Sequence, residues 1–286
     1  MNLCDQRTIR DLLSRHGFRF SKSMGQNFLI DPQIPADIAA ASGADGSCGV
    51  LEIGPGIGPL TAELAARAGK VVSVELDKAL LPVLEETMAP FPHVEILPGD
   101  VLKLDLAALA AEKFQGLTPI VCANLPYNIT TPILEKLIET PAFSSFTVLI
   151  QREVAQRLAA PPGSGDGGSF SLFLQYHMEA ELLFTVPPEK FLPAPKVTSA
   201  VLRCVRRPHP AVAPADEVLF FRVIRGAFLL RRKTLANSLS AALPGLSKTA
   251  AQAAILRCGL PADVRGERLT LEDFKKLADS LEIPKK

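Results

Sequence analysis

The first half of the chain alternates short apolar runs with segments of helical pattern, and this order limits the possible folds. Each run is mostly apolar on both sides, as in the strands of a parallel sheet that is covered on both faces. Such an alternation predicts a doubly wound α/β sheet. The expected strands are 49–53, 71–74, 94–97, 120–123 and 146–150, and the expected helices between them are 60–68, 78–88, 104–114 and 131–139.

The second half changes character at "RRPHPAVAPAD" (206–216), which is rich in Pro and Ala and indicates a linker. Before it we expect two more strands, at 181–186 and 197–206, as a terminal pair on the same sheet. After it the pattern is helical only. We therefore expect a catalytic domain over 1–206 and a small all-α domain over 207–286. The expected helices of this half are 170–178, 217–230, 234–243, 248–257 and 271–281.

A glycine-rich turn, "EIGPGIG" (52–58), follows the first predicted strand. Its glycines, Gly54, Gly56 and Gly58, allow a tight turn and a close approach of the backbone to a ligand, although tight packing alone is an alternative. The spacing is G-x-G-x-G, which differs from the G-x-G-x-x-G of pyrophosphate-binding turns. This favours a nucleoside ligand without phosphates over a nicotinamide cofactor.

Polar residues end two neighbouring predicted strands. Glu75 ends the second, about 20 residues after the glycine turn, where a carboxylate can accept both hydroxyls of a ribose. Asp100 ends the third and could accept from an adenine amine, or it caps a turn. Asp77 is a rival to Glu75, with helix capping as its alternative. Because the carboxyl ends of parallel strands share one edge, we expect a single crevice.

The stretch "VCANLPYNITTPIL" (121–134) places an amide, a proline and an aromatic ring at the same edge. Asn124 offers a side-chain carbonyl, and the backbone of Leu125 or Pro126 offers a second acceptor, since a proline holds the preceding residue extended. Tyr127 offers a flat face beside them. Two acceptors and a ring suit a planar base with an exocyclic amine. The alternative makes Asn124 a turn former and Tyr127 a core residue.

The helix after this turn has its own expected start. Thr131 is a suitable N-cap, and Pro132 would then occupy the first helical position. We therefore expect the helix to begin directly after Thr131.

Charge is uneven along a chain whose formal net charge is only +1. Lys190 to Lys233 contains ten Lys and Arg residues but only two acids, Asp216 and Glu217. Such an excess suggests a surface that faces a polyanion, with an ordinary solvated face as the alternative.

Several other classes of protein are disfavoured. The five cysteines are scattered without a C-x-x-C pair, which argues against a disulfide framework or a zinc site. The start has no long apolar core, so we expect no signal peptide. No apolar run approaches about 18 residues, so we expect no membrane span and a cytoplasmic location. The four histidines lie at no predicted strand end.

Several motifs together resemble those of the ribosomal RNA adenine dimethyltransferases, the KsgA/RsmA family, over about residues 15–280. They are "MGQNFLID" (24–31), "EIGPGIGPLT" (52–61), "VELD" (74–77), "GDVL" (99–102), "NLPYNI" (124–129), "FLPAPKVTSAV" (191–201) and "RRKTLANSL" (231–239). The resemblance implies a Rossmann-like class I methyltransferase sheet, S-adenosylmethionine as methyl donor, and no metal. It also implies two adjacent adenines of 16S ribosomal RNA as the target.

The resemblance further implies roles for individual residues. Donor contacts would come from Asn27, Leu29, Gly54, Glu75, Asp100 and Asn124, to which the glycine turn adds Gly56. The target base would meet Asn124, Leu125, Pro126, Tyr127 and Phe191, with core packing as the alternative for Phe191. The basic charge itself, rather than the resemblance, indicates contacts to RNA phosphates from Arg231, Arg232 and Lys233, together with Arg7, Arg10, Arg15, Arg19 and Lys22. We expect a monomer.

Three rival functions remain at this point. A dehydrogenase with the same fold is the first, although the glycine spacing and "NLPY" argue against it. The second is an adenine methyltransferase that acts on large-subunit RNA or DNA. The third is an RNA-binding or transcription factor that has lost catalysis, against which the intact "EIGPG", Glu75 and "NLPY" argue.

Overall fold

The computed structural model describes residues 1–18 and 26–281. They form two compact units, one of Met1–Ala155 with Glu181–Arg206 and one of Gln156–Ala180 with Arg207–Lys286. The second unit therefore includes residues 156–180. The expected boundary between residues 206 and 207 would have placed them in the catalytic domain. The functional division of the chain into domains stays a prediction.

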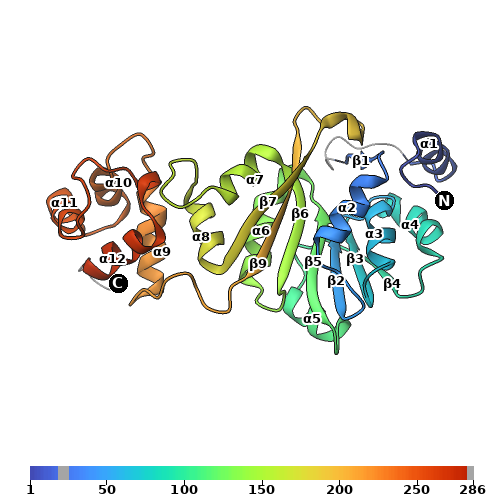
Figure 1. The fold of residues 1–286 in the computed structure, drawn as a ribbon, viewed down its shortest axis with the longest axis horizontal. Coiled ribbons are helices and arrows are strands. Elements are labelled where there is room, and N and C mark those ends of the chain that lie inside the picture. Colours follow the sequence, from blue (N-terminus) through green and yellow to red (C-terminus); the bar gives the residue numbers. More distant parts are fainter. Residues whose placement is uncertain (19–25, 282–286) are drawn as a thin grey trace. The chain divides into compact units, whose positions relative to one another are not determined.

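A seven-stranded sheet forms the centre of the first unit (Figure 1). The pairs β2–β3, β3–β4, β2–β5 and β5–β6 are parallel, and β9 is antiparallel to β6. The strand order β4-β3-β2-β5-β6-β9-β7 confirms the doubly wound sheet and the terminal strand pair. The strands are β2 (Cys48–Ile53), β3 (Lys70–Glu75), β4 (Val94–Pro98), β5 (Thr118–Asn124), β6 (Ser145–Gln151), β7 (Met178–Val186) and β9 (Ser199–Arg206).

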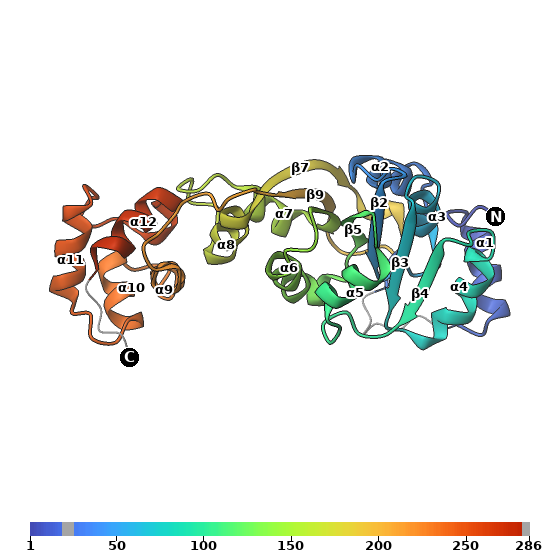
Figure 2. The ribbon, with the colours of Figure 1, turned by 90° about the horizontal axis from the view of Figure 1, so that it is seen from below.

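Helices cover both faces of this sheet (Figure 2). Ile38 of α2 and Leu64 of α3 share a core cluster with Val50 of β2. The next residue of β2, Leu51, points to the opposite face and is fully buried as well. Burial on both sides explains why the strands are apolar throughout. The helices between the strands are α2 (Gln33–Ala41), α3 (Pro59–Ala65), α4 (Leu81–Met88), α5 (Leu106–Lys113), α6 (Thr130–Glu139) and α7 (Arg152–Ala159).

The expected start of α6, at Pro132, is wrong by two residues. The helix begins at Thr130, directly after a short 3₁₀ helix over Tyr127–Ile129, so Thr131 lies inside the helix and does not cap it. The Thr130 hydroxyl donates to the carbonyl of Pro126 at 3.0 Å. Pro132 then falls in the first turn, where a backbone N–H has no partner within the helix, so its missing donor is tolerated.

A short ribbon joins two distant segments of the first unit. β1 (Phe28–Leu29) pairs antiparallel with β8 (Phe191–Leu192). Lys190 Nζ also contacts Asp31 Oδ2 at 2.7 Å. These contacts fix the segment that begins at residue 26 against the chain that precedes β9, an arrangement that no local pattern predicts.

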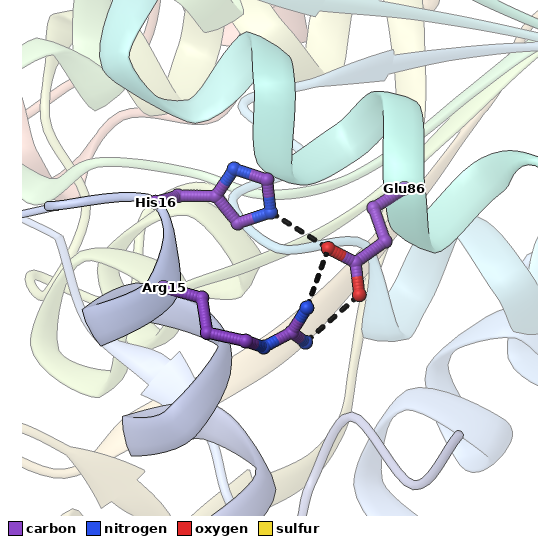
Figure 3. A network of polar contacts seen from close by, with 3 residues as sticks. All are labelled: Arg15, His16 and Glu86. Carbon is purple, nitrogen blue, oxygen red and sulfur yellow. Dashed lines mark hydrogen bonds and ion pairs between the residues drawn. The ribbon is translucent and has the colours of Figure 1, made fainter.

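The amino-terminal helix α1 (Gln6–Arg15) packs beside α4. Its buried residues, including Leu12, share a cluster with Leu84 of α4. At its end, Arg15 makes two hydrogen bonds to Glu86 of α4, at 3.1 and 2.8 Å, and His16 makes a third at 2.7 Å (Figure 3). Two sequence neighbours therefore hold one carboxylate of α4.

The second unit has its own apolar core. Phe220, Leu239 and Phe274 come from three different helices and are fully buried there, and Tyr176 of α8 belongs to the same cluster. All five predicted helices of this half are confirmed, although the helix expected over 217–230 ends at Ala227. They are α8 (Ser169–His177), α9 (Glu217–Ala227), α10 (Leu235–Ala242), α11 (Lys248–Arg257) and α12 (Leu271–Ser280).

Across residues 1–18 and 26–281, none of the helices combines the length and the apolar character needed to cross a membrane.

Candidate functional site

A pocket of about 190 Å³ opens at the carboxyl ends of the parallel strands. It lies where the strand order reverses between β2 and β5, which is the usual ligand position in such sheets. Five short segments line it. They are residues 26–29, 52–56, 74–77, 99–101 and 124–129, together with Pro59, Leu60 and Leu80.

Nearly all the predicted site residues of the sheet domain meet in this pocket. Its lining includes Asn27, Leu29, Gly54, Gly56, Glu75, Asp100, Asn124, Leu125, Pro126 and Tyr127. Phe191 does not line it. That side chain is 2 % exposed and belongs to a core cluster with Leu29 and Leu60, so its expected place near a target base stays a prediction.

The glycine turn has backbone angles that other residues rarely adopt. Gly54 and Gly56 have φ values of 69° and 64°. A Cβ atom on Gly56 would lie 3.1 Å from the ring of Phe28, so a side chain has little room there. The N–H of Gly56 donates to Glu75 Oε2 at 3.3 Å. The turn is thereby held against the end of β3.

Glu75 is 6 % exposed, and burial raises its pKa. Its Oε1 accepts from the backbone N–H of Asp77 at 2.8 Å, which keeps the carboxylate at the pocket wall. For Asp77, the structure shows the alternative role of helix capping, because its Oδ1 accepts from the N–H of Ala79 at 3.0 Å. Of these two carboxylates, Glu75 is the one without a role in starting a helix.

Asp100 both caps a turn and faces the pocket. Its Oδ1 accepts from the N–H of Leu102 at 3.0 Å, and its Oδ2 lies 3.8 Å from Nζ of the exposed Lys103. The two interpretations of this residue from sequence are therefore compatible, because a carboxylate has acceptor capacity beyond one hydrogen bond.

The side-chain amide of Asn124 has a defined orientation. Its Nδ2 donates to the carbonyl of Asn27 at 3.3 Å, which turns Oδ1 away from that carbonyl. The carbonyl of Pro126 accepts from the N–H of Ile129 and from the hydroxyl of Thr130. Of the two backbone acceptors considered from sequence, Pro126 is thus occupied by the start of α6, and Leu125 is the one left for a ligand.

Tyr127 is held at the hydroxyl end of its side chain. Its hydroxyl lies 2.6 Å from Oγ of Ser199, a fully buried residue at the start of β9. Burial raises the pKa of Tyr127, so the phenol stays neutral near pH 7. Ser199 was not among the predicted site residues. Its position at the start of β9, a strand that also contains Arg203 and Arg206, gave no local signal of this contact.

Glu52 is a second site residue that was not predicted from the sequence. It lines the pocket, is 1 % exposed, and its Oε2 accepts from Thr61 Oγ1 and Ser73 Oγ, each at 2.7 Å. Burial raises its pKa to about 7. A buried acid inside the "EIGPG" motif is a signal that was present in the sequence.

None of the predicted RNA contacts within the described residues belongs to the pocket lining. Arg231, Arg232 and Lys233 lie between α9 and α10 and are exposed. Arg7 and Arg10 of α1 are exposed as well. Arg15 is exposed but paired with Glu86, as Figure 3 shows. The predicted contacts at Arg19 and Lys22 lie outside the described residues.

The ionisable side chains that line the pocket are all acidic. The lining contains four carboxyl groups, those of Glu52, Glu75, Asp77 and Asp100, and within the described part of the chain it contains no Lys or Arg. No group of three or more His, Cys, Asp and Glu side chains that could hold a metal ion occurs among the described residues.

Comparison with known proteins identifies the family. A sequence model of the family "Ribosomal RNA adenine dimethylase" matches residues 17–282. The "Ribosomal RNA small subunit methyltransferase A" of Geobacillus thermodenitrificans is 47% identical over 276 residues, which cover 95% of this chain and 94% of that protein. The protein of the same name from Bacillus thuringiensis is 45% identical over 280 residues and 96% of both chains.

Two solved structures share the fold. The 23S rRNA methyltransferase ErmE is 27% identical, with a TM-score of 0.69 over 89% of this chain and 99% of its own. A dimethyladenosine transferase from Plasmodium falciparum is 23% identical, with a TM-score of 0.70 over 87% of this chain and 95% of its own. With the family model spanning nearly the whole sequence, this chain belongs to the ribosomal RNA adenine dimethylase family.

Proposed function

We propose that this protein transfers methyl groups from S-adenosylmethionine to the exocyclic amines of two adjacent adenines in the 3′-terminal hairpin of 16S ribosomal RNA. The product would be N6,N6-dimethyladenine, formed during small-subunit biogenesis. The observation that carries the proposal is the convergence of Asn124 and Tyr127 on the pocket that Glu75 also lines. The names of relatives that are 45–47% identical over nearly their whole length support the small-subunit target.

The pocket suits a cationic nucleoside better than a phosphorylated one. Its carboxyl groups, of which Glu52 is partly protonated near pH 7, are accompanied by no Lys or Arg in the described lining, so they would repel a pyrophosphate and attract a positive charge. S-adenosylmethionine supplies an activated methyl group on a positively charged sulfonium. Glu75 would hold a ribose and Asp100 an adenine amine, while Gly54 and Gly56 leave room for close approach of the backbone. The same charges argue against the dehydrogenase alternative.

The turn over 124–127 would bind and orient the target amine. An adenine amine is a weak nucleophile because its lone pair is delocalised into the ring. Asn124 Oδ1 and the Leu125 carbonyl can accept from its two N–H groups, which favours a pyramidal nitrogen and frees the lone pair. The neutral phenol of Tyr127 offers a stacking face, worth about 1–3 kcal/mol per base. The chain thus acts mainly by positioning and polarising.

Contacts to RNA outside the pocket would come from the exposed basic turn at Arg231, Arg232 and Lys233. We also propose a monomer that works in the cytoplasm, where ribosomal subunits are assembled. Light scattering of the purified protein tests the oligomeric state.

Two alternatives to this function remain. ErmE is named for 23S rRNA, but its identity to this chain is 27%, well below that of the small-subunit relatives. A non-catalytic RNA-binding factor would not need the acceptors of the turn at 124–127.

Transfer of labelled methyl groups separates these possibilities. The substrates are small subunits lacking the dimethyladenines, large subunits and naked DNA, each followed by nucleoside analysis. We expect dimethyladenine in the small subunits only. Label in the large subunits or in DNA would replace the proposed target, and no label in any substrate would favour the non-catalytic alternative.

A further inference from the structure

The turn over 124–127 is held to the sheet along its backbone and at its aromatic ring by a single polar contact. The N–H of Leu125 donates to the carbonyl of Leu149 in β6 at 3.1 Å, so the backbone of the turn stays at the sheet edge. The half-buried side chain of Tyr127 lines the pocket. Among the described residues, its hydroxyl has one partner, Oγ of Ser199 at 2.6 Å. The position of the ring tip therefore depends on Ser199.

Ser199 is a rigid anchor for this ring. It is fully buried, and it pairs with Gln151 in the antiparallel ladder of β6 and β9. The carbonyl of the preceding residue, Thr198, accepts from the N–H of Arg152 at 3.0 Å. Backbone hydrogen bonds therefore fix the strand at this point, and serine has only the χ1 torsion by which its hydroxyl could move. Through Ser199, the hydroxyl of Tyr127 is tied to the central sheet.

The proposed reaction uses the same pocket twice for each adenine. In each transfer the nitrogen lone pair forms a bond to the methyl carbon while the bond between this carbon and sulfur breaks. Sulfur keeps that electron pair as S-adenosylhomocysteine forms, and the nitrogen then releases one proton to solvent. The adenine amine therefore brings two N–H groups to the first transfer, whereas the monomethylated amine brings only one to the second.

The loss of one N–H changes which contacts orient the amine. In the first transfer, Asn124 Oδ1 and the Leu125 carbonyl can both accept, so two hydrogen bonds and the stacking face orient the nitrogen. In the second transfer one of these hydrogen bonds is absent, and the face of Tyr127 carries a larger share of the orientation. Because a small displacement of a reacting atom is costly in rate, a loosened ring should matter most in the second transfer.

We propose that Ser199 is a positioning residue that holds Tyr127 in place for the second methyl transfer. The inference rests on the proposed function, because it takes adenine dimethylation as the reaction. Ser199 is fully buried and does not line the pocket, so it acts only through the Tyr127 hydroxyl. Without this hydrogen bond the protein would still monomethylate adenine but would complete dimethylation slowly.

Time courses of methyl transfer test this difference between the two steps. Small subunits lacking the dimethyladenines are incubated with saturating S-adenosylmethionine. Nucleoside analysis then gives the amounts of N6-methyladenine and N6,N6-dimethyladenine, summed over both adenines, and these yield a rate constant for each transfer. We expect Ser199→Ala to lower the ratio of the second rate constant to the first about 3- to 10-fold, the range for one net hydrogen bond. N6-methyladenine should accumulate as a result.

Tyr127→Phe removes the same hydrogen bond from the other side and keeps the aromatic ring. It should lower the ratio of rate constants as Ser199→Ala does, and the double variant should lower it little further. Tyr127→Phe also tests the proposal if Ser199→Ala does not fold, as judged by its thermal melt.

Ser42→Ala is the matched control for a general loss of stability. Ser42 lies in the same unit, is 3 % exposed, and its Oγ donates to the carbonyl of Ala39 at 2.7 Å. It does not line the pocket. This variant therefore loses a buried hydroxyl of the same kind, and we expect it to keep the wild-type ratio of rate constants even if its melting temperature falls.

Two results overturn this role of Ser199 while leaving the proposed function intact. One is a wild-type ratio of rate constants in Ser199→Ala and Tyr127→Phe, and the other is an equal fall of the ratio in Ser42→Ala. Failure of the wild type to form either methylated nucleoside in small subunits would instead overturn the proposed function together with this inference.

Discussion

The buried carboxyl of Glu52 makes the stability of this protein depend on pH in a defined direction. Its two hydroxyl partners, Thr61 and Ser73, donate to a single oxygen, Oε2. Burial is the main cause that raises its pKa from 4.5 to about 7, and the negative charge of Glu75 adds to it. The folded chain therefore holds a proton on Glu52 at pH values where the unfolded chain has released it.

The sign follows from the linkage between proton binding and folding. Because the folded-state pKa of Glu52 is the higher one, its contribution to stability is fully present below pH 4.5 and is lost as the pH rises through about 7. One pKa unit corresponds to about 1.4 kcal/mol, so the total loss is about 3 kcal/mol. Glu52→Gln does not titrate. The new amide adds an N–H₂ group that needs acceptors, but this penalty is the same at every pH.

Urea unfolding followed by circular dichroism at pH 5, 6, 7 and 8 measures the effect. We expect the free energy of unfolding of Glu52→Gln, relative to the wild type, to increase by about 3 kcal/mol from low to high pH. Titrating groups that do not interact with Glu52 cancel in this difference, whereas Glu75 cancels only in part, because its charge acts on Glu52. Glu85→Gln, at an exposed glutamate of α4, is the matched control. Parallel pH curves for wild type and Glu52→Gln would refute the assignment of a raised pKa to this carboxyl.

Three further predictions concern the turn over 124–127, its contact to Ser199, and the basic turn over 231–233. Asn124→Ala should slow methyl transfer about 10²–10³-fold, as expected for the loss of one preorganised polar contact, with a smaller loss of S-adenosylhomocysteine affinity; near-normal turnover would contradict the role of Asn124. Ser199→Ala should lower the free energy of unfolding by about 1–3 kcal/mol, because it leaves the Tyr127 hydroxyl unpaired. Adding Tyr127→Phe to this variant should lower it little further. Additive losses in the double variant would show that the two hydroxyls act separately. Replacing residues 231–233 by alanine should weaken binding to small subunits and reduce its salt slope by about one per lost phosphate contact, with unchanged donor affinity; an unchanged slope would exclude these residues from the RNA interface.

Much of the fold could be predicted because its signals are local. Each strand of the parallel sheet is a short apolar run, and the polar residues that follow, such as Glu75 and Asn124, fall at the same sheet edge by the geometry of parallel strands. The glycine turn was recognisable because Gly54 and Gly56 adopt positive φ values that few other residues tolerate.

The parts that could not be predicted depend on contacts between distant segments. The hydroxyl partner of Tyr127 is 72 residues away at Ser199, and nothing in either local sequence encodes the pair. The choice of Leu125 over Pro126 as the remaining backbone acceptor follows from where α6 starts. That start lies two residues before the expected one, and the Thr130 hydroxyl donates to the Pro126 carbonyl.

The ribbon of β1 with β8 has a consequence for how the protein comes into being on the ribosome. Phe28 is paired with Leu192, so the wall of the pocket that carries Asn27 lacks its partner strand until more than half of the chain has been synthesised. At roughly 5–20 residues per second, the interval between the two segments is on the order of ten to thirty seconds. A nascent chain would therefore carry its glycine turn and its acidic strand ends well before it could close them into a complete donor site.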